Sequence, residues 1–208
     1  MTRLEKLLRI MRAPPPERSP QAPLPTALPC LDRILGGGLP QGQLLSVHGA
    51  VGVGKTTLGL QLCRAAQAAG PVAFMDPDCG LSPGLARSLG VSMRELLYSA
   101  PPLWQVPPLL EGLVTLGGLS LVVVDIAEGW PSPGSLRPLR RHAAASGTTV
   151  LFLTQHRAAL ASIAFASHRR LMLRHSGALR AGHRVWVEDL ESGAGAALQL
   201  RHGRGFSG

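Results

Sequence analysis

The part of this sequence most directly suited to chemistry is a glycine-rich segment. Residues 49–57 read GAVGVGKTT and fit the pattern G-x-x-x-x-G-K-[ST], between an apolar run at 43–47 and a helical run at 56–69. Glycines let backbone N–H groups turn toward phosphate oxygens, and the helix that follows directs the positive end of its dipole at them. The segment predicts a nucleoside triphosphate site formed by Gly49, Gly52, Gly54, Lys55, Thr56 and Thr57.

A magnesium site is expected beside this loop. Lys55 is predicted to reach the outer phosphates, and the hydroxyl of Thr56 is predicted to bind Mg²⁺. The run LSLVVVD at 119–125 has the composition of a buried strand and ends in Asp125. A carboxylate at the end of such a strand can help to position Mg²⁺ beside the loop, so we predict that Asp125 is the second magnesium-organising residue.

Hydrolysis also needs a group that orients or deprotonates water. Asp76 and Asp78 follow an apolar run at 72–75, and ligands of open α/β sheets gather at the carboxyl ends of strands. Either carboxylate suits this role on position alone, and either could instead be a turn residue beside Pro77.

Length and composition restrict the class of protein. The 208 residues, 45% of them hydrophobic, suit one domain of ordinary size. The three cysteines are odd in number and lack C-x-x-C spacing, which predicts neither disulfides nor zinc and fits a reducing cytoplasm. No apolar run has the length of a membrane span, and the first residues are too charged for a secretory signal. We expect a cytoplasmic protein without membrane contact.

The net charge of +9 is concentrated toward the C-terminus, where residues 126–208 hold 11 arginines and 4 acidic residues. Clustered arginines can neutralise nucleic-acid phosphates, or can simply be solvated surface. Two clusters stand out, at Arg137, Arg140 and Arg141 and at Arg169, Arg170 and Arg174.

The N-terminus is predicted to be a separate unit. Leu4, Leu7, Leu8 and Met11 follow i, i+3, i+4, i+7 spacing, which predicts an amphipathic helix over 2–12. Seven prolines between residues 13 and 29 predict an extended tether. The apolar face of the helix can pack on its own domain, dock on a neighbouring subunit or partner, or lie on a membrane surface. We assign 1–25 to this unit and 26–208 to the core.

The core alternates strand-like and helical runs, which predicts an α/β fold with a mainly parallel sheet flanked by helices. Strands are expected at 43–47, 72–76, 119–125 and 148–154, and helices at 56–69, 83–89 and 106–116. Further strands at 169–173, 184–190 and 196–200 predict a short C-terminal β extension.

Three segments together resemble the RecA recombinase core. They are LDRILGGGLPQG at 31–42, AFMDPD at 73–78 and ARSLGV at 86–91. The resemblance extends over about residues 26–208 and is strongest before residue 101. It implies a RecA-like P-loop core that binds ATP and Mg²⁺.

The resemblance also implies roles for single residues. Asp78 takes the place of the water-activating carboxylate, normally a glutamate, and its shorter side chain leaves the carboxylate about 1.5 Å further from the water. Gln155 takes the place of the glutamine that senses the terminal phosphate and signals to a DNA-binding loop. Basic groups that remain in or near that loop are His156, Arg157, Arg169 and Arg170.

Several positions depart from the RecA pattern. Ser82 and Leu85 stand where an aspartate and a stacking tyrosine adjoin adenine. Asp189 and Glu191 stand where two lysines reach a neighbour's phosphates, and carboxylates there would repel them. The first DNA-binding loop is curtailed, and we expect no counterpart of the RecA C-terminal domain. This trimmed pattern resembles ImuA-like relatives that assist translesion DNA synthesis.

Three hypotheses follow. The first is a non-recombinase accessory factor of DNA repair, in the SOS response or translesion synthesis, with weak or switch-like ATP hydrolysis. It would contact a repair protein through the N-terminal helix and DNA through the C-terminal basic surface. The second is a self-associating ATPase of RadA or KaiC type that takes a cation in trans from Arg174, Arg180 or Arg184. The third is a scaffold that has lost hydrolysis.

Overall fold

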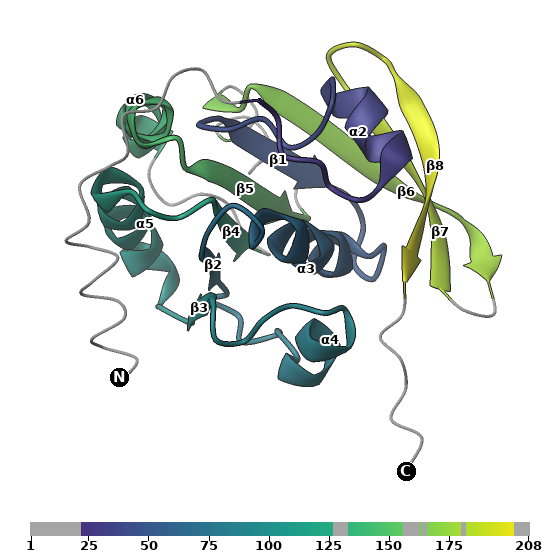
Figure 1. The fold of residues 1–208 in the computed structure, drawn as a ribbon, viewed down its shortest axis with the longest axis horizontal. Helices are drawn as coiled ribbons and strands as arrows, with labels where there is room; N and C mark the ends of the chain where they lie inside the picture. The colour runs from purple at the N-terminus through teal and green to yellow at the C-terminus, as the bar shows by residue number, and fades with distance from the viewer. Residues whose placement is uncertain (1–21, 127–132, 156–162, 164–165, 180–181, 202–208) are drawn as a thin grey trace.

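One mixed sheet of eight strands organises the chain in the computed structural model, which describes residues 22–126, 133–155, 163, 166–179 and 182–201 (Figure 1). The spatial order of the strands is β3-β2-β4-β5-β1-β6-β7-β8. Their bounds are β1 Leu44–His48, β2 Val72–Met75, β3 Leu96–Ser99, β4 Leu121–Ile126, β5 Thr149–Thr154, β6 Arg169–Leu179, β7 Gly182–Asp189 and β8 Gly195–Arg201.

The first six strands in this order are parallel. Strands β1, β2 and β5 are buried at every residue, as mainly apolar strands covered on both faces are expected to be. Strand β1 lies between β5 and β6, so the loop that follows His48 emerges from the middle of the sheet. The prediction of an α/β fold with a mainly parallel sheet is confirmed.

Helices cover both faces of the sheet and enclose two apolar cores. Residues of α2, α3 and α4 share one core, and residues of α5 and α6 share the other. In Figure 1, α5 and α6 stand together at the left of the view, away from α2 and α3. The bounds are α2 Pro29–Leu35, α3 Lys55–Ala66, α4 Pro83–Ser88, α5 Val106–Leu116 and α6 Leu136–Ser146, with short 3₁₀ turns η1 Leu103–Gln105 and η2 Pro133–Ser135.

The C-terminal strands continue this sheet. Strand β6 pairs with β1 in parallel, so it belongs to the central sheet, and only β7 and β8 add the antiparallel extension at its right in Figure 1. Buried Val185, Val187, Leu198 and Leu200 pack this extension against the core that contains α3.

The expected elements differ from the observed ones mainly by omission. The structure adds β3, α2 and α6 to the predicted set. Helix α2 begins at Pro29, the last proline of the predicted tether, and proline suits a first helical position. Residues 22–28 are non-helical and include an antiparallel bridge between Leu24 and Leu39. The helix predicted over 2–12 lies outside the described residues. Among the helices that are described, none has the length and apolarity that a membrane span requires.

Candidate nucleotide-binding site

The loop between β1 and α3 holds its glycines in conformations that other residues adopt with strain. Gly52 and Gly54 have φ of +75° and +101°, in the left-handed region. A Cβ on Gly49 would lie 2.7 Å from the carbonyl oxygen of Leu173, and one on Gly54 would lie 2.6 Å from Leu200 Cδ1. The loop is therefore closely packed from behind by β6 and β8, and its shape depends on glycine.

Lys55, the first residue of α3, is buried with its ammonium turned back onto the loop. Its Nζ donates hydrogen bonds of 2.8 Å to the carbonyl oxygens of Gly49 and Ala50. Burial lowers the pKa of Lys55, and the nearby carboxylate of Asp125 partly opposes this. The loop thus places a partly desolvated cation where phosphate oxygens, as charged acceptors, would bind strongly.

Thr56 and Asp125 meet at the carboxyl edge of the sheet. Thr56 Oγ1 donates a 2.8 Å hydrogen bond to Asp125 Oδ2, which joins the start of α3 to the end of β4. Burial is the main cause that raises the pKa of Asp125, the charges of Asp76 and Asp78 raise it further, and the Thr56 hydrogen bond lowers it. A hydroxyl and a carboxylate are oxygen ligands of the kind that a hard divalent cation such as Mg²⁺ prefers. A bound cation would also favour the charged form of Asp125, which burial disfavours.

Asp76 and Asp78 differ in their surroundings. Asp76 is buried, and its Oδ2 accepts hydrogen bonds from the Leu81 N–H at 2.7 Å and the Tyr98 hydroxyl at 3.3 Å. Asp78 is exposed at the same edge, near enough for its charge to act on Asp125. Asp76 thus holds the turn after β2, which leaves Asp78 as the better candidate for contact with water.

Three other residues singled out in the sequence lie within the described part of the chain. Gln155 follows β5, the neighbour of β1, and is exposed. Ser82 caps α4, since its Oγ accepts a 3.3 Å hydrogen bond from the Leu85 N–H. Thr57 lies half-buried in the first turn of α3. His156 and Arg157 lie outside the described residues.

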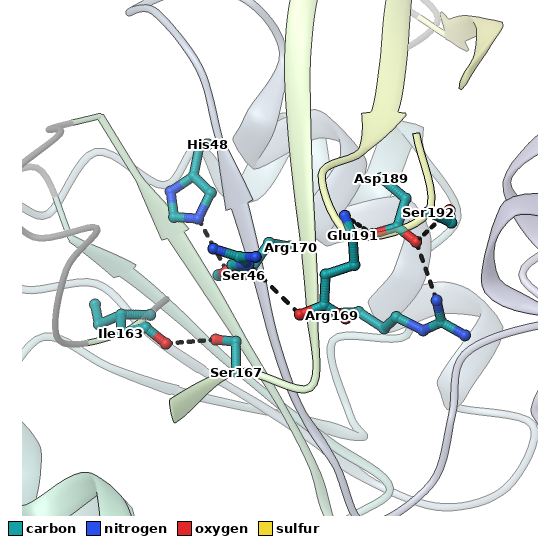
Figure 2. A network of polar contacts seen from close by, with 9 residues as sticks. All are labelled: Ser46, His48, Ile163, Ser167, Arg169, Arg170, Asp189, Glu191 and Ser192. Carbon is teal, nitrogen blue, oxygen red and sulfur yellow. Dashed lines mark hydrogen bonds and ion pairs between the residues drawn. The ribbon is translucent and has the colours of Figure 1, made fainter. Parts of the chain in front are cut away.

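Sequence analysis missed a buried histidine directly before the loop. His48 Nε2 lies 2.9 Å from Ser46 Oγ, and His48 Nδ1 has no hydrogen-bond partner within the described part of the chain (Figure 2). Burial, then the charges of Arg170 and Lys55, lower the pKa of His48 to about 4. Two polar residues at i and i+2 in an otherwise apolar strand were the available signal.

Arg169 and Arg170, predicted to contact DNA, are each paired with a carboxylate (Figure 2). Arg169 Nη1 lies 3.0 Å from Oδ2 of the fully buried Asp189, and Arg170 Nε lies 3.5 Å from Glu191 Oε1. The acidic residues that depart from the RecA pattern thus neutralise two arginines of the same chain.

A second missed feature is an exposed aromatic side chain next to two arginines on the outer face of the sheet. Trp186 of β7 is 41% exposed and lies opposite Arg174 of β6 in the antiparallel register. Arg184 is exposed two residues earlier on the same face of β7. The Arg174 side chain is 64% exposed, with Glu188 at 3.7 Å. This set of Arg174, Arg184 and Trp186 is called the Trp186 face below.

Comparison with known proteins agrees with this geometry. The family model of the RecA N-terminal domain matches residues 10–131. Protein RecA of Clavibacter michiganensis subsp. michiganensis is 41% identical over 119 residues, which are 56% of this chain and 33% of that protein. Protein RecA of Mycobacterium tuberculosis strain H37Rv is 40% identical over 119 residues, 56% of this chain and 15% of that protein. The aligned region is thus a third or less of these relatives' length. The match covers more than half of the chain, which therefore belongs to the RecA family.

Proposed function

We propose that this protein is an ATP-binding accessory factor of DNA repair, without recombinase activity, that uses ATP weakly or as a switch. The observation that carries the proposal is the joining of the glycine loop, Lys55, Thr56 and Asp125 at one edge of the sheet. Bound Mg²⁺ would supply charge neutralisation on the phosphates. The family relationship supports a role in DNA repair, and the accessory role, including one in translesion synthesis, rests on the departures from the RecA pattern.

Each residue of the site has one proposed task. Lys55 exchanges its two loop carbonyls for phosphate oxygens, because charged acceptors bind an ammonium more strongly than neutral ones. Thr56 and Asp125, whose side chains meet, would hold Mg²⁺. Asp78 orients water, and Gln155 contacts the terminal phosphate from the end of β5. Slow hydrolysis is expected because an aspartate at position 78 reaches less far than a glutamate.

The test is equilibrium binding of Mg-ATP to the full chain and to Lys55→Ala, with Lys6→Ala as the matched control because these two are the only lysines. Loss of one charged contact to phosphate is expected to weaken binding at least about tenfold. Unchanged affinity in Lys55→Ala would overturn the site assignment. Equal weakening in both variants would show a general charge effect instead.

Contact with DNA is the second part of the proposal. The Arg169 and Arg170 side chains are 36% exposed and each is paired, whereas the Arg174 side chain is 64% exposed beside Glu188. We therefore assign this contact to the Trp186 face, where an exposed indole adjoins two exposed arginines. Single strands bind such surfaces by base stacking on the aromatic ring and by phosphate contacts with the cations.

The scaffold hypothesis remains distinct from this proposal and is favoured by the same short Asp78. Steady-state ATP hydrolysis with and without single-stranded DNA separates the two. Turnover that is stimulated by DNA and lost in Lys55→Ala would show a working DNA-dependent ATPase. Nucleotide binding without turnover above that of Lys55→Ala would favour the scaffold.

A further inference from the structure

A groove on the side of the sheet opposite α5 and α6 plays no part in the proposed nucleotide site. It has a volume of about 990 Å³ and lies between the end of the tether, α2, α3, the end of α4 and β8. Its walls are mainly apolar, with Leu28, Cys30, Leu89 and Leu198 among them.

The floor of this groove is a face of α3 with the spacing that a second helix would fit. Gln61, Arg64 and Ala65 of α3 line it at i, i+3 and i+4, and Ala68 lines it from the turn that follows the helix. The two alanines allow another backbone to approach closely.

We propose that residues 2–12 of the same chain dock in this groove as an amphipathic helix. Leu4, Leu7, Leu8 and Met11 would supply the apolar face that the groove lacks. A helix of this length spans about 16 Å. The chain enters the described structure at Ala22, and Pro25, only three residues later, already lines the groove.

The tether is long enough for this intramolecular contact. Residues 13–21 in extended polyproline form span about 28 Å, and the proline-free stretch Glu17-Arg18-Ser19 allows the chain to reverse. A short tether holds the helix near the groove at a millimolar effective concentration, which favours the same chain over a second copy.

Charge determines how the helix would lie. Glu5 is the only acidic residue among the first 16, and it borders the apolar face formed by Leu4 and Leu8 on a helical wheel. Arg64 is exposed and is the one cation among the groove-lining residues. We therefore expect the helix to lie with its apolar face in the groove and with Glu5 on the side of Arg64. The inference does not depend on the proposed nucleotide site.

The test uses Cys30, a natural thiol in the wall of the groove. In full-length protein with Cys79→Ser, Leu8→Cys is compared with the matched variant Lys6→Cys, which lies on the opposite side of the predicted helix. A short bismaleimide should join position 8 to Cys30 at least about five times faster than position 6, because only position 8 faces the groove. Equal rates for the two variants would overturn the proposal.

Two further measurements decide the occupant and the orientation. Cross-linking a mixture of isotopically heavy and light chains should give linked peptides of one label only, whereas mixed pairs would show docking between copies and overturn the intramolecular arrangement. Arg64→Glu should slow the Leu8→Cys reaction, and adding Glu5→Arg should restore it. Absence of that rescue would overturn the proposed orientation.

Discussion

At the residue scale, the two aspartates after β2 are predicted to have different roles: Asp76 stabilises the fold, and Asp78 acts in ATP hydrolysis. Asp76→Asn should lower the free energy of unfolding by about 1–3 kcal/mol, because the buried carboxylate accepts from both Leu81 and Tyr98. Asp78→Asn should change stability by no more than about 0.5 kcal/mol and reduce ATP turnover about 100-fold. Urea unfolding and steady-state hydrolysis measure the two effects. A variant pair with the effects exchanged would assign the water-activating role to Asp76.

His48 should make stability depend on pH. Its pKa is lowered to about 4 in the folded chain, and the unfolded residue titrates near 6.5. Between these values the unfolded chain binds a proton that the folded chain does not, so stability falls as pH decreases through this window. From pH 7 to pH 5 the wild type should lose about 2 kcal/mol more than His48→Gln, measured by urea unfolding. Equal losses would contradict a neutral buried imidazole.

At the element scale, strands β6 and β7 present the Trp186 face, for which single-stranded DNA is the proposed ligand. Trp186→Ala should weaken binding by about 1–3 kcal/mol through lost stacking. Arg174→Ser with Arg184→Ser should reduce the slope of log affinity against log salt by about 1.4, at about 0.7 per phosphate contact.

The matched control for these variants is Arg33→Ser with Arg87→Ser. Both arginines are exposed on helices α2 and α4 over the other face of the sheet, and the change in net charge is the same. Fluorescence anisotropy over a salt series measures all the variants. An equal loss in the control pair would reduce the effect to net charge alone and exclude the Trp186 face as the contact.

The sequence predicted those elements whose pattern is local. Apolar runs predicted five of the six parallel strands, all except β3, and the loop motif predicted where α3 begins. Helix α6 was missed because three arginines and Pro138 interrupt its apolar pattern, although Leu136, Leu139 and Ala143 are buried at helical spacing. The ion pairs of Arg169 and Arg170 could not be predicted from spacing, because they depend on the turn after β7.

At the scale of the whole molecule, the described core should unfold as one unit. The sheet is continuous from β3 to β8, and each of the two apolar cores includes residues from several of its strands. Trp104 lies at the β3 side and Trp186 on β7, so each can report on one side of the sheet. In variants that keep one of these two tryptophans, with the others replaced by phenylalanine, the urea midpoints should agree within roughly 0.3 M. Separate midpoints would divide the core into two cooperative units.

Leu200 and Leu173 stand directly behind the glycine loop, and this contact has a thermodynamic consequence. Since β8 and β6 already hold the loop in shape, its conformational entropy is lost when the chain folds and not when a ligand arrives. These strands lie beyond residues 10–131, which the family model of the RecA N-terminal domain matches. Strands outside the family match therefore preorganise the loop of the proposed nucleotide site. If that proposal holds, changes in β6 and β8 should alter nucleotide affinity without removing any contact to a phosphate.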